Sequence, residues 1–277
     1  MNECHSWLAC DDIRHLDVGE LIGFGAVKHV YQTSWQNNTM AVAFLNNNNY
    51  SADFLFGIEV LKQLGWSKYI VQLIGFCEEV PVFLTEYHPA GSSVNVDIIF
   101  GNDSHSLSQR FQLCIDYVKI LAFLHDSPAG PLMMCDSSTL VKTLEQYLLT
   151  TSGNLVLNDV DSLAKVMEGG TVCGHRELKG DFVAPEQKWP FDGDEYRTER
   201  MPPYSEKADV WKIPPVCSFF LGKSDGARAL HYHLHNMHRR CREKEPHRRP
   251  SARELLRAYE TLNWSYFGKK AEEKEEL

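Results

Sequence analysis

The chain has 277 residues, a formal net charge of −9 at neutral pH, and 43% hydrophobic and 11% aromatic residues. That length and apolar content are enough for one large core or for two lobes. The acidic balance argues against non-specific nucleic-acid binding, because such binding needs cations that displace phosphate counterions. The basic pair at 239–240 is followed by alternating charges and predicts a solvated helix face. We therefore expect no nucleic-acid partner.

Several features bear on the cellular compartment. No run approaches the roughly 18 apolar residues of a membrane span, and the start lacks the pattern of a signal peptide. Eight cysteines without a C-x-x-C pair give zinc binding little support and leave disulfides possible. The last four residues, 274–277, read Lys-Glu-Glu-Leu, close to a lumenal retention signal. A charged, frayed terminus is the alternative.

Four N-x-[ST] sequons are candidate glycosylation sites, although each tripeptide is a weak signal by itself. Together with the cysteines and the C-terminus, they favour an oxidising secretory lumen. The sequon asparagines are Asn37, Asn49, Asn102 and Asn263.

The first part of the chain is rich in predicted strands. Residues 1–19 are polar with scattered apolar positions, and they predict an extension that docks on the following domain. Two β-rich runs follow between 20 and 45, with a turn near 35–38. Apolar residues between 54 and 64 then recur at helical spacing.

After two further predicted strands, at 70–73 and 82–84, the pattern becomes helical. A long helix is predicted near 111–123, and the last third is mainly helical. A β-rich first third and a helical remainder predict an α+β chain of two lobes. We place them at 20–88 and 89–262, with a tail at 263–277.

A glycine-rich segment lies between the first two β-rich runs. Residues 23–30 read G-F-G-A-V-K-H-V, and a strand follows the glycines, as in the kinase phosphate loop. Gly23 and Gly25 would let the backbone approach phosphate oxygens; a plain hairpin turn is the alternative. Lys28 replaces the third kinase glycine, while Phe44 occupies the place of the V-A-I-K lysine. The pattern resembles the with-no-lysine kinases, so we expect Lys28 to bind phosphate rather than face solvent.

The lysine's usual helix partner stays unassigned. Glu59 lies on the predicted helix, but the apolar register places Gly57 nearer the expected position. Residues 84–92, L-T-E-Y-H-P-A-G-S, resemble the strand and hinge of kinases. Backbone groups from Glu86 to His88 would then bind adenine, with a generic strand-to-loop turn as the alternative.

Two aspartates stand where kinases need carboxylates. Met134-Cys135-Asp136 replaces H-R-D, which leaves Asp136 as the candidate base. Asp159 occupies the D-F-G position as a metal ligand, and Gln146 replaces the metal-binding asparagine. Ten residues separate Asp136 from Gln146, against about five in typical kinases. We infer an insertion in the substrate-holding loop.

Other interpretations of these aspartates remain. An aspartate in a loop often caps a turn, and D-V-D at 159–161 is also the D-x-D of metal-dependent glycosyltransferases. Because Cys135 replaces the arginine that pairs with a phosphorylated activation loop, we expect an enzyme that is not gated by phosphorylation.

Three intact motifs identify the fold. A-P-E stands at 184–186, Y-S-x-K-x-D-V-W at 204–211, and C-x-x-x-x-P-x-x-R-P-S-x-x-E-L-L at 241–256. By resemblance to kinases, Glu186 and Arg249 form a buried structural pair, and Asp209 opens the central helix. The chain thus resembles a bilobal protein kinase, with a β-rich first lobe and a mainly helical second one. These motifs argue for the fold and not for activity.

The departures from the kinase pattern together resemble the protein O-mannose kinases. They include the G-x-G-x-x-K loop, M-C-D, Q-Y-L-L-T at 146–150, D-V-D, and G-H-R-E-L-K-G-D-F-V-A-P-E-Q at 174–187. The resemblance spans about residues 14–260. It implies a type II single-pass protein of the endoplasmic reticulum, whose anchor would precede this sequence. We expect a monomer.

The resemblance also implies a reaction. With ATP and Mg²⁺ or Mn²⁺, the 6-hydroxyl of mannose would be phosphorylated in a GalNAc-GlcNAc-Man trisaccharide on alpha-dystroglycan. Asp136 would orient the hydroxyl and accept its proton, Asp159 and Gln146 would hold metal, and Lys28 would neutralise phosphate charge. The alternatives are a pseudokinase that binds partners without catalysis, and a protein Ser/Thr or Tyr kinase.

Overall fold

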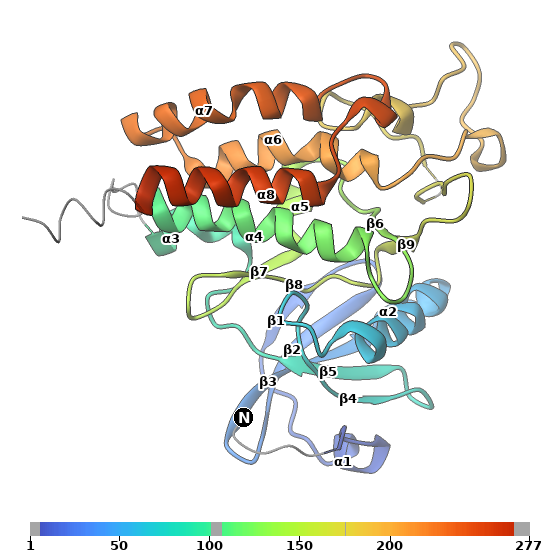
Figure 1. The fold of residues 1–277 in the computed structure, drawn as a ribbon. Coiled ribbons are helices and arrows are strands. Elements are labelled where there is room, and N and C mark those ends of the chain that lie inside the picture. The colour runs from blue at the N-terminus through green and yellow to red at the C-terminus, as the bar shows by residue number, and fades with distance from the viewer. Residues whose placement is uncertain (1–5, 101–106, 175, 269–277) are drawn as a thin grey trace, which may run out of the picture. The chain divides into compact units, whose positions relative to one another are not determined.

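The computed structural model describes residues 6–100, 107–174 and 176–268. The chain divides into two compact units (Figure 1). The first unit comprises Met1–Pro89 and Val156–Leu163, and the second comprises Ala90–Leu155 and Ala164–Leu277. No helix in the described part of the chain combines the length and apolar character needed to cross a membrane.

The first unit contains a five-stranded antiparallel sheet in the order β1-β2-β3-β5-β4. The β2–β3 hairpin pairs Lys28 with Leu45 and Trp35 with Asn38. Gln36 and Asn37 form its turn with positive φ angles of 50° and 64°, which suits the twist of a two-residue hairpin. The strands are β1 (Leu21–Phe24), β2 (Lys28–Trp35), β3 (Asn38–Leu45), β4 (Leu73–Cys77) and β5 (Val82–Glu86).

Most strand predictions are confirmed, but one is displaced. We predicted a strand at 70–73, whereas β4 begins at Leu73 and ends at Cys77. Ile70 forms only an isolated bridge to Leu157. The predicted segment therefore overlaps β4 only at Leu73, because residues 73–77 are the ones that pair with β5.

Helix α2 (Ser51–Leu64) belongs to the same unit and confirms the helix predicted for this region. Its buried positions include Phe54, Ile58 and Leu61, spaced as one helix face requires. The short helix α1 (Cys10–Arg14) is joined to the end of β4 by the disulfide Cys10–Cys77.

The second unit is mainly helical, as predicted. Its helices are α3 (Val96–Phe100), α4 (Leu107–His125), α5 (Leu140–Glu145), α6 (Lys207–Leu221), α7 (Asp225–Cys241) and α8 (Ala252–Asn263). The short strands β6 (Leu132–Met134) and β7 (Tyr147–Leu149) lie in it, while β8 (Leu155–Leu157) and β9 (Leu163–Lys165) lie where the chain passes between the units.

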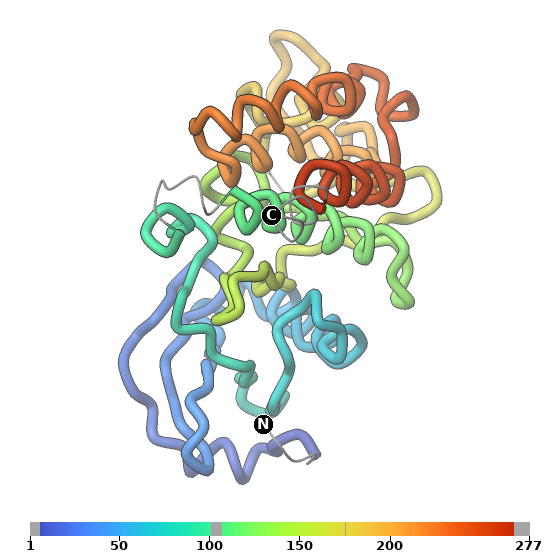
Figure 2. The backbone as a smooth tube through the Cα atoms, turned by 60° about the vertical axis from the view of Figure 1, so that its left-hand side comes forward, coloured from blue at the N-terminus to red at the C-terminus, as the bar shows by residue number. Residues whose placement is uncertain are grey.

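Helix α4 lies at the centre of this helical packing. It contacts α6 and α8, and α8 runs beside it in both views of the backbone (Figure 2). The disulfide Cys114–Cys217 joins α4 to α6. Helix α8 begins with a capping box in which Ser251 and Glu254 each bond the other's backbone amide, the arrangement that satisfies the first free N–H groups of a helix.

Candidate active-site residues

The glycine-rich segment is the connection from β1 to β2. The Gly25 N–H donates to the Lys28 carbonyl at 2.8 Å, which closes the turn. A Cβ added at Gly25 would meet no atom nearer than the Lys28 oxygen at 4.0 Å, and one at Gly23 none nearer than 3.8 Å. Packing within the protein therefore does not demand these glycines, which fits a loop that leaves room for phosphate.

Lys28 joins two aspartates of the first unit. Its Nζ donates to Asp159 Oδ1 and, at 2.7 Å, to Asp161 Oδ2. The side chains of Lys28, Asp159 and Asp161 are 12%, 27% and 4% exposed, respectively. All three ionisable groups are therefore largely withdrawn from water. Carboxylate oxygens are the ligands that Mg²⁺ prefers, and this pair supplies two beside a fixed cation.

Burial and charge act in opposite directions on this cluster. Burial disfavours the charged form of Lys28, but the attraction and hydrogen bonds of Asp159 and Asp161 outweigh it and hold the pKa of Lys28 above its usual value. Burial, with the neighbouring Asp159 charge, raises the pKa of Asp161 to about 8 against the pull of Lys28. Lys28 is thus a cation at neutral pH, while Asp161 titrates within the physiological range.

The helix α2 supplies no acidic partner for Lys28. Gly57 faces Asp161 so closely that a Cβ at position 57 would lie 2.9 Å from the Asp161 Cβ. Glu59 lies on another face and pairs with Lys62 at 2.5 Å. Asp161 therefore occupies the space beside Gly57, and the glycine is required there by close approach.

Phe44 stands where the V-A-I-K lysine of kinases would lie. Phe44 lies in β3 opposite His29 and Val82, and it packs partly buried against the core cluster of the sheet. Phe44 is therefore a packing residue. It leaves the lysine's usual role to another position.

The predicted hinge begins where β5 ends. The Glu86 N–H donates to the Gln72 carbonyl at 3.1 Å, and Glu86 Oε1 accepts from the Gln72 N–H at 3.0 Å. His88 Nε2 lies 3.4 Å from the same carboxylate. Burial opposes ionisation, but the hydrogen bonds of His88 and Gln72 outweigh it and lower the pKa of Glu86. The side chains of Glu86 and His88 thus hold the backbone of this segment in place.

In the second unit, Asp136 lies on a loop that α6 supports. Asp209 Oδ2 accepts from the Met134 N–H at 3.1 Å, and Lys212 Nζ donates to Ser137 Oγ at 2.5 Å. Ser137 Oγ in turn donates to the Met134 carbonyl at 2.8 Å. The backbone on both sides of Asp136 is thereby fixed. The Asp136 side chain itself is 47% exposed, so it can meet a solvent-borne substrate.

The predicted insertion after Asp136 is helix α5. Thr139 caps its start by accepting from the Lys142 N–H at 3.3 Å, and Gln146 stands at its C-cap. Gln146 Nε2 donates to the Asp136 carbonyl. Gln146 Oε1 is buried and has no hydrogen-bond partner among the described residues. An unsatisfied amide oxygen fits the metal-ligand role predicted for this residue.

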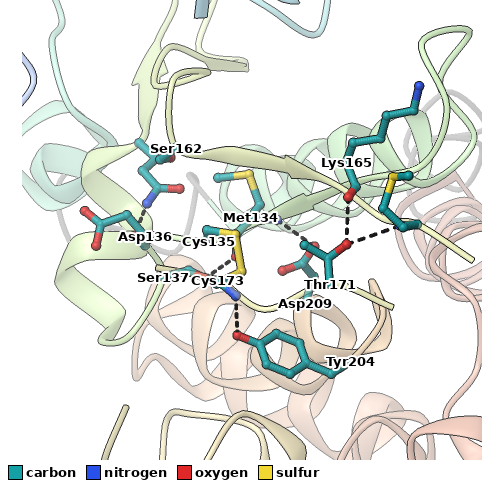
Figure 3. Close-up of a disulfide and its surroundings, with 12 residues drawn as sticks. Met134, Cys135, Asp136, Ser137, Ser162, Lys165, Thr171, Cys173, Tyr204 and Asp209 are labelled. Carbon is teal, nitrogen blue, oxygen red and sulfur yellow. Dashed lines mark hydrogen bonds between the residues drawn. A yellow bond between two sulfur atoms is a disulfide. The ribbon is translucent and has the colours of Figure 1, made fainter. Parts of the chain in front are cut away.

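A disulfide joins Cys135, next to Asp136, to Cys173 (Figure 3). The Cys173 N–H donates to the Tyr204 hydroxyl at 2.8 Å, which ties the far end of the disulfide to the segment before α6. The Asp136 carboxylate points away from the sulfur atoms. The loop is therefore attached by a covalent bond at the position where kinases place an arginine.

The predicted structural residues lie together in the second unit. Arg249 donates to both carboxylate oxygens of Glu186, at 2.5 and 2.7 Å, and its side chain is fully buried. Asp209 is also fully buried, and its Oδ2 lies 3.2 Å from His125 Nε2 as well. A planar guanidinium facing a carboxylate in this way is the strong, bidentate form of an ion pair.

The candidate glycosylation sites are in different settings. Asn37, in the β2–β3 turn, and Asn49 are exposed. Asn263 ends α8 and is half-buried. Asn102 lies outside the described residues.

Comparison with known proteins shows the family. No protein-family model matches the chain. A protein O-mannose kinase of Gallus gallus is 42% identical over 271 residues, which are 95% of this chain and 76% of that protein. The Homo sapiens protein O-mannose kinase is 40% identical over 95% of this chain and 77% of its own length. The chain belongs to the protein O-mannose kinase family.

More distant relatives agree with the fold. The bovine mitogen-activated protein kinase kinase kinase 7 is 22% identical over 89% of this chain and 43% of its own length. With the β-rich first unit and the helical second unit, it confirms the predicted α+β protein-kinase fold in this O-mannose kinase family member.

Sequence reasoning missed three features of this O-mannose kinase family member. The sequence presents Asp161 only within an alternative D-x-D motif, and it predicts neither the Cys135–Cys173 disulfide nor a role for Lys142. The signals were faint: a glycine at position 57 inside a helix, a cysteine in place of an arginine, and a lysine within an insertion. Each becomes informative only when its partner is known.

Proposed function

We propose that this chain transfers the terminal phosphoryl group of ATP to the 6-hydroxyl of O-linked mannose in a GalNAc-GlcNAc-Man trisaccharide on alpha-dystroglycan. Membership of the protein O-mannose kinase family supports the reaction class. The observation that carries catalysis is Lys28, held by Asp159 and Asp161. Lys28 supplies the phosphate-binding cation, because Phe44, at the usual lysine position, carries no charge.

The proposed roles follow from phosphoryl-transfer chemistry, in which positioning and charge neutralisation do most of the work. Lys28 neutralises phosphate oxygens, and backbone groups between Glu86 and His88 bind adenine. Asp159 and Gln146 would hold Mg²⁺ or Mn²⁺, which supplies positive charge to the phosphates when bound. Asp136 orients the sugar hydroxyl and accepts its proton.

The proposed location is the lumen of the endoplasmic reticulum, in a monomer with a membrane anchor outside this sequence. Three disulfides among the described cysteines support an oxidising compartment, since such bonds are rare where thiols are kept reduced. Exposed sequons at Asn37 and Asn49 are accessible to glycosylation. Both observations suit a lumenal enzyme acting on a secreted or surface glycoprotein.

The test is direct. The protein is incubated with ATP, Mg²⁺ and the free O-mannosyl trisaccharide, and the sugar is weighed by mass spectrometry. We expect a gain of one phosphate, abolished by Asp136→Ala and retained by Asp192→Ala, a change at an exposed aspartate. Mannose alone, the disaccharide and an unglycosylated peptide serve as acceptor controls.

Other outcomes separate the alternatives. Phosphate on the unglycosylated peptide would indicate a protein kinase. If the folded protein phosphorylates no acceptor, Mg²⁺-dependent ATP binding distinguishes an enzyme with a different acceptor from a pseudokinase that acts as a scaffold.

A further inference from the structure

The inserted helix α5 is attached to Asp136 at two points. Lys142, on its first turn, donates from Nζ to Asp136 Oδ1 at 2.8 Å, and Gln146, at its C-cap, donates to the Asp136 carbonyl. The helix begins at a Thr139 cap, which fixes its first turn relative to the loop. One short helix therefore contacts both the backbone and the carboxylate of the candidate base.

Different residues hold the backbone and the carboxylate of Asp136. The backbone is held by Asp209 at the Met134 N–H, by Ser137 Oγ at the Met134 carbonyl, and by Gln146 at the Asp136 carbonyl. The carboxylate has a single hydrogen-bond partner within the described part of the chain, the ammonium on Oδ1. Torsion about the carboxylate bond is soft, so the backbone contacts alone do not fix which oxygen faces outward.

We propose that Lys142 is a positioning residue for phosphoryl transfer: it binds Asp136 Oδ1 and leaves Oδ2 to accept the proton of the acceptor hydroxyl. This inference rests on the proposed function, in which Asp136 is the base. The O–H bond of the acceptor breaks as its oxygen bonds to phosphorus, the proton goes to Oδ2, and ADP leaves. Lys142 keeps its own protons throughout.

A purely structural role predicts a different result. The two side chains are 37% and 47% exposed, and an exposed ion pair adds at most about 1 kcal/mol to stability. Misplacing a reacting group by about 1 Å, in contrast, can cost about 100-fold in rate. Removing Lys142 should therefore lower turnover far more than it lowers stability.

The experiment compares Lys142→Met, Lys142→Arg and Lys119→Met in steady-state assays with ATP, Mg²⁺ and the trisaccharide. Lys119 is the matched control, since it makes a partly exposed ion pair with Glu260 at 3.5 Å in the same unit, with side chains 27% and 49% exposed. We expect Lys142→Met to lower kcat about 10- to 100-fold, with the KM for ATP and the melting temperature unchanged. Lys142→Arg should recover most of the loss, because a guanidinium also binds a carboxylate. Lys119→Met should match the wild type.

Several results would overturn the inference. Wild-type kcat in Lys142→Met would exclude a role, and a parallel fall in melting temperature would assign the loss to folding. No recovery in Lys142→Arg would show that positive charge beside Asp136 is not what matters. If the wild-type protein itself transfers no phosphate, the proposed function fails, and this inference fails with it.

Discussion

The replacement Arg249→Met tests the central ion pair of the second unit. All five N–H donors of the Arg249 guanidinium are used. Two bond Glu186, and three bond the carbonyl oxygens of Lys207, Glu243 and Lys244. The Arg249 side chain is fully buried and that of Glu186 is 14% exposed. Methionine fills a similar volume but leaves every one of these acceptors without its donor.

Removing one member of a buried pair costs roughly 3–5 kcal/mol, because the remaining charge loses its compensation in a poorly solvated place. For a folded unit of this size, each kcal/mol lowers Tm by about 2–4 °C. We therefore expect Arg249→Met to lower Tm by about 6–20 °C in calorimetry. The protein is measured with its disulfides intact, so that the unfolded states of the variant and the wild type carry the same cross-links.

The control is Arg253→Met. Arg253 pairs with Asp126 at 2.7 Å, but the two side chains are 60% and 52% exposed, so the expected loss is under about 1 kcal/mol. A loss of similar size in both variants would refute the argument from burial. A double variant, Glu186→Leu with Arg249→Met, should recover part of the stability, because no charge is then left buried.

Three further predictions concern the first unit. Lys28→Met should weaken Mg²⁺-ATP binding at least tenfold in calorimetric titration, since Lys28 is the cation that contacts both Asp159 and Asp161; unchanged affinity would exclude Lys28 from the nucleotide site. The pKa of Asp161 is about 8 in the folded protein and 3.8 as a free side chain. The folding stability that protonated Asp161 contributes is therefore complete below pH 4 and is lost as the pH rises through 8. The stability of Asp161→Asn relative to the wild type should therefore rise between pH 4 and pH 8 and stay constant above pH 8. A stability difference that does not change with pH would contradict the raised pKa of Asp161. The Cys10–Cys77 disulfide spans 67 residues, so replacing both cysteines by serine should cost roughly 4 kcal/mol in chemical denaturation, and a loss below about 1 kcal/mol would show that the extension adds little.

Local patterns account for what the sequence predicted well. The helix α2, the hairpin strands β2 and β3, and the long helix α4 follow from periodicity, because the spacing of apolar residues is fixed by the geometry of each element. The motifs that contain Glu186 and Arg249 identified the kinase fold, since chance recurrence of three such patterns in order is remote. The candidate base Asp136 and the substitute Lys28 were found by their place among these motifs.

The partners of these residues were decided by tertiary structure. Lys28 and Asp161 are 133 residues apart in the chain, and no periodicity relates them. Gly57 explains why Asp161 fits there, but only once α2 has been packed beside it. The boundary of β4 likewise depended on its pairing with β5, which selected residues 73–77 from a longer apolar run.

The same reason applies to the loop of Asp136. The sequence shows an insertion and a cysteine in place of an arginine, but eight cysteines allow many pairings, and an insertion has no fixed conformation. Only the folded chain joins Cys135 to Cys173 and directs Lys142 back to Asp136. Sequence thus indicated which residues are candidates for the chemistry, while the packing of distant segments decided what holds each of them in position.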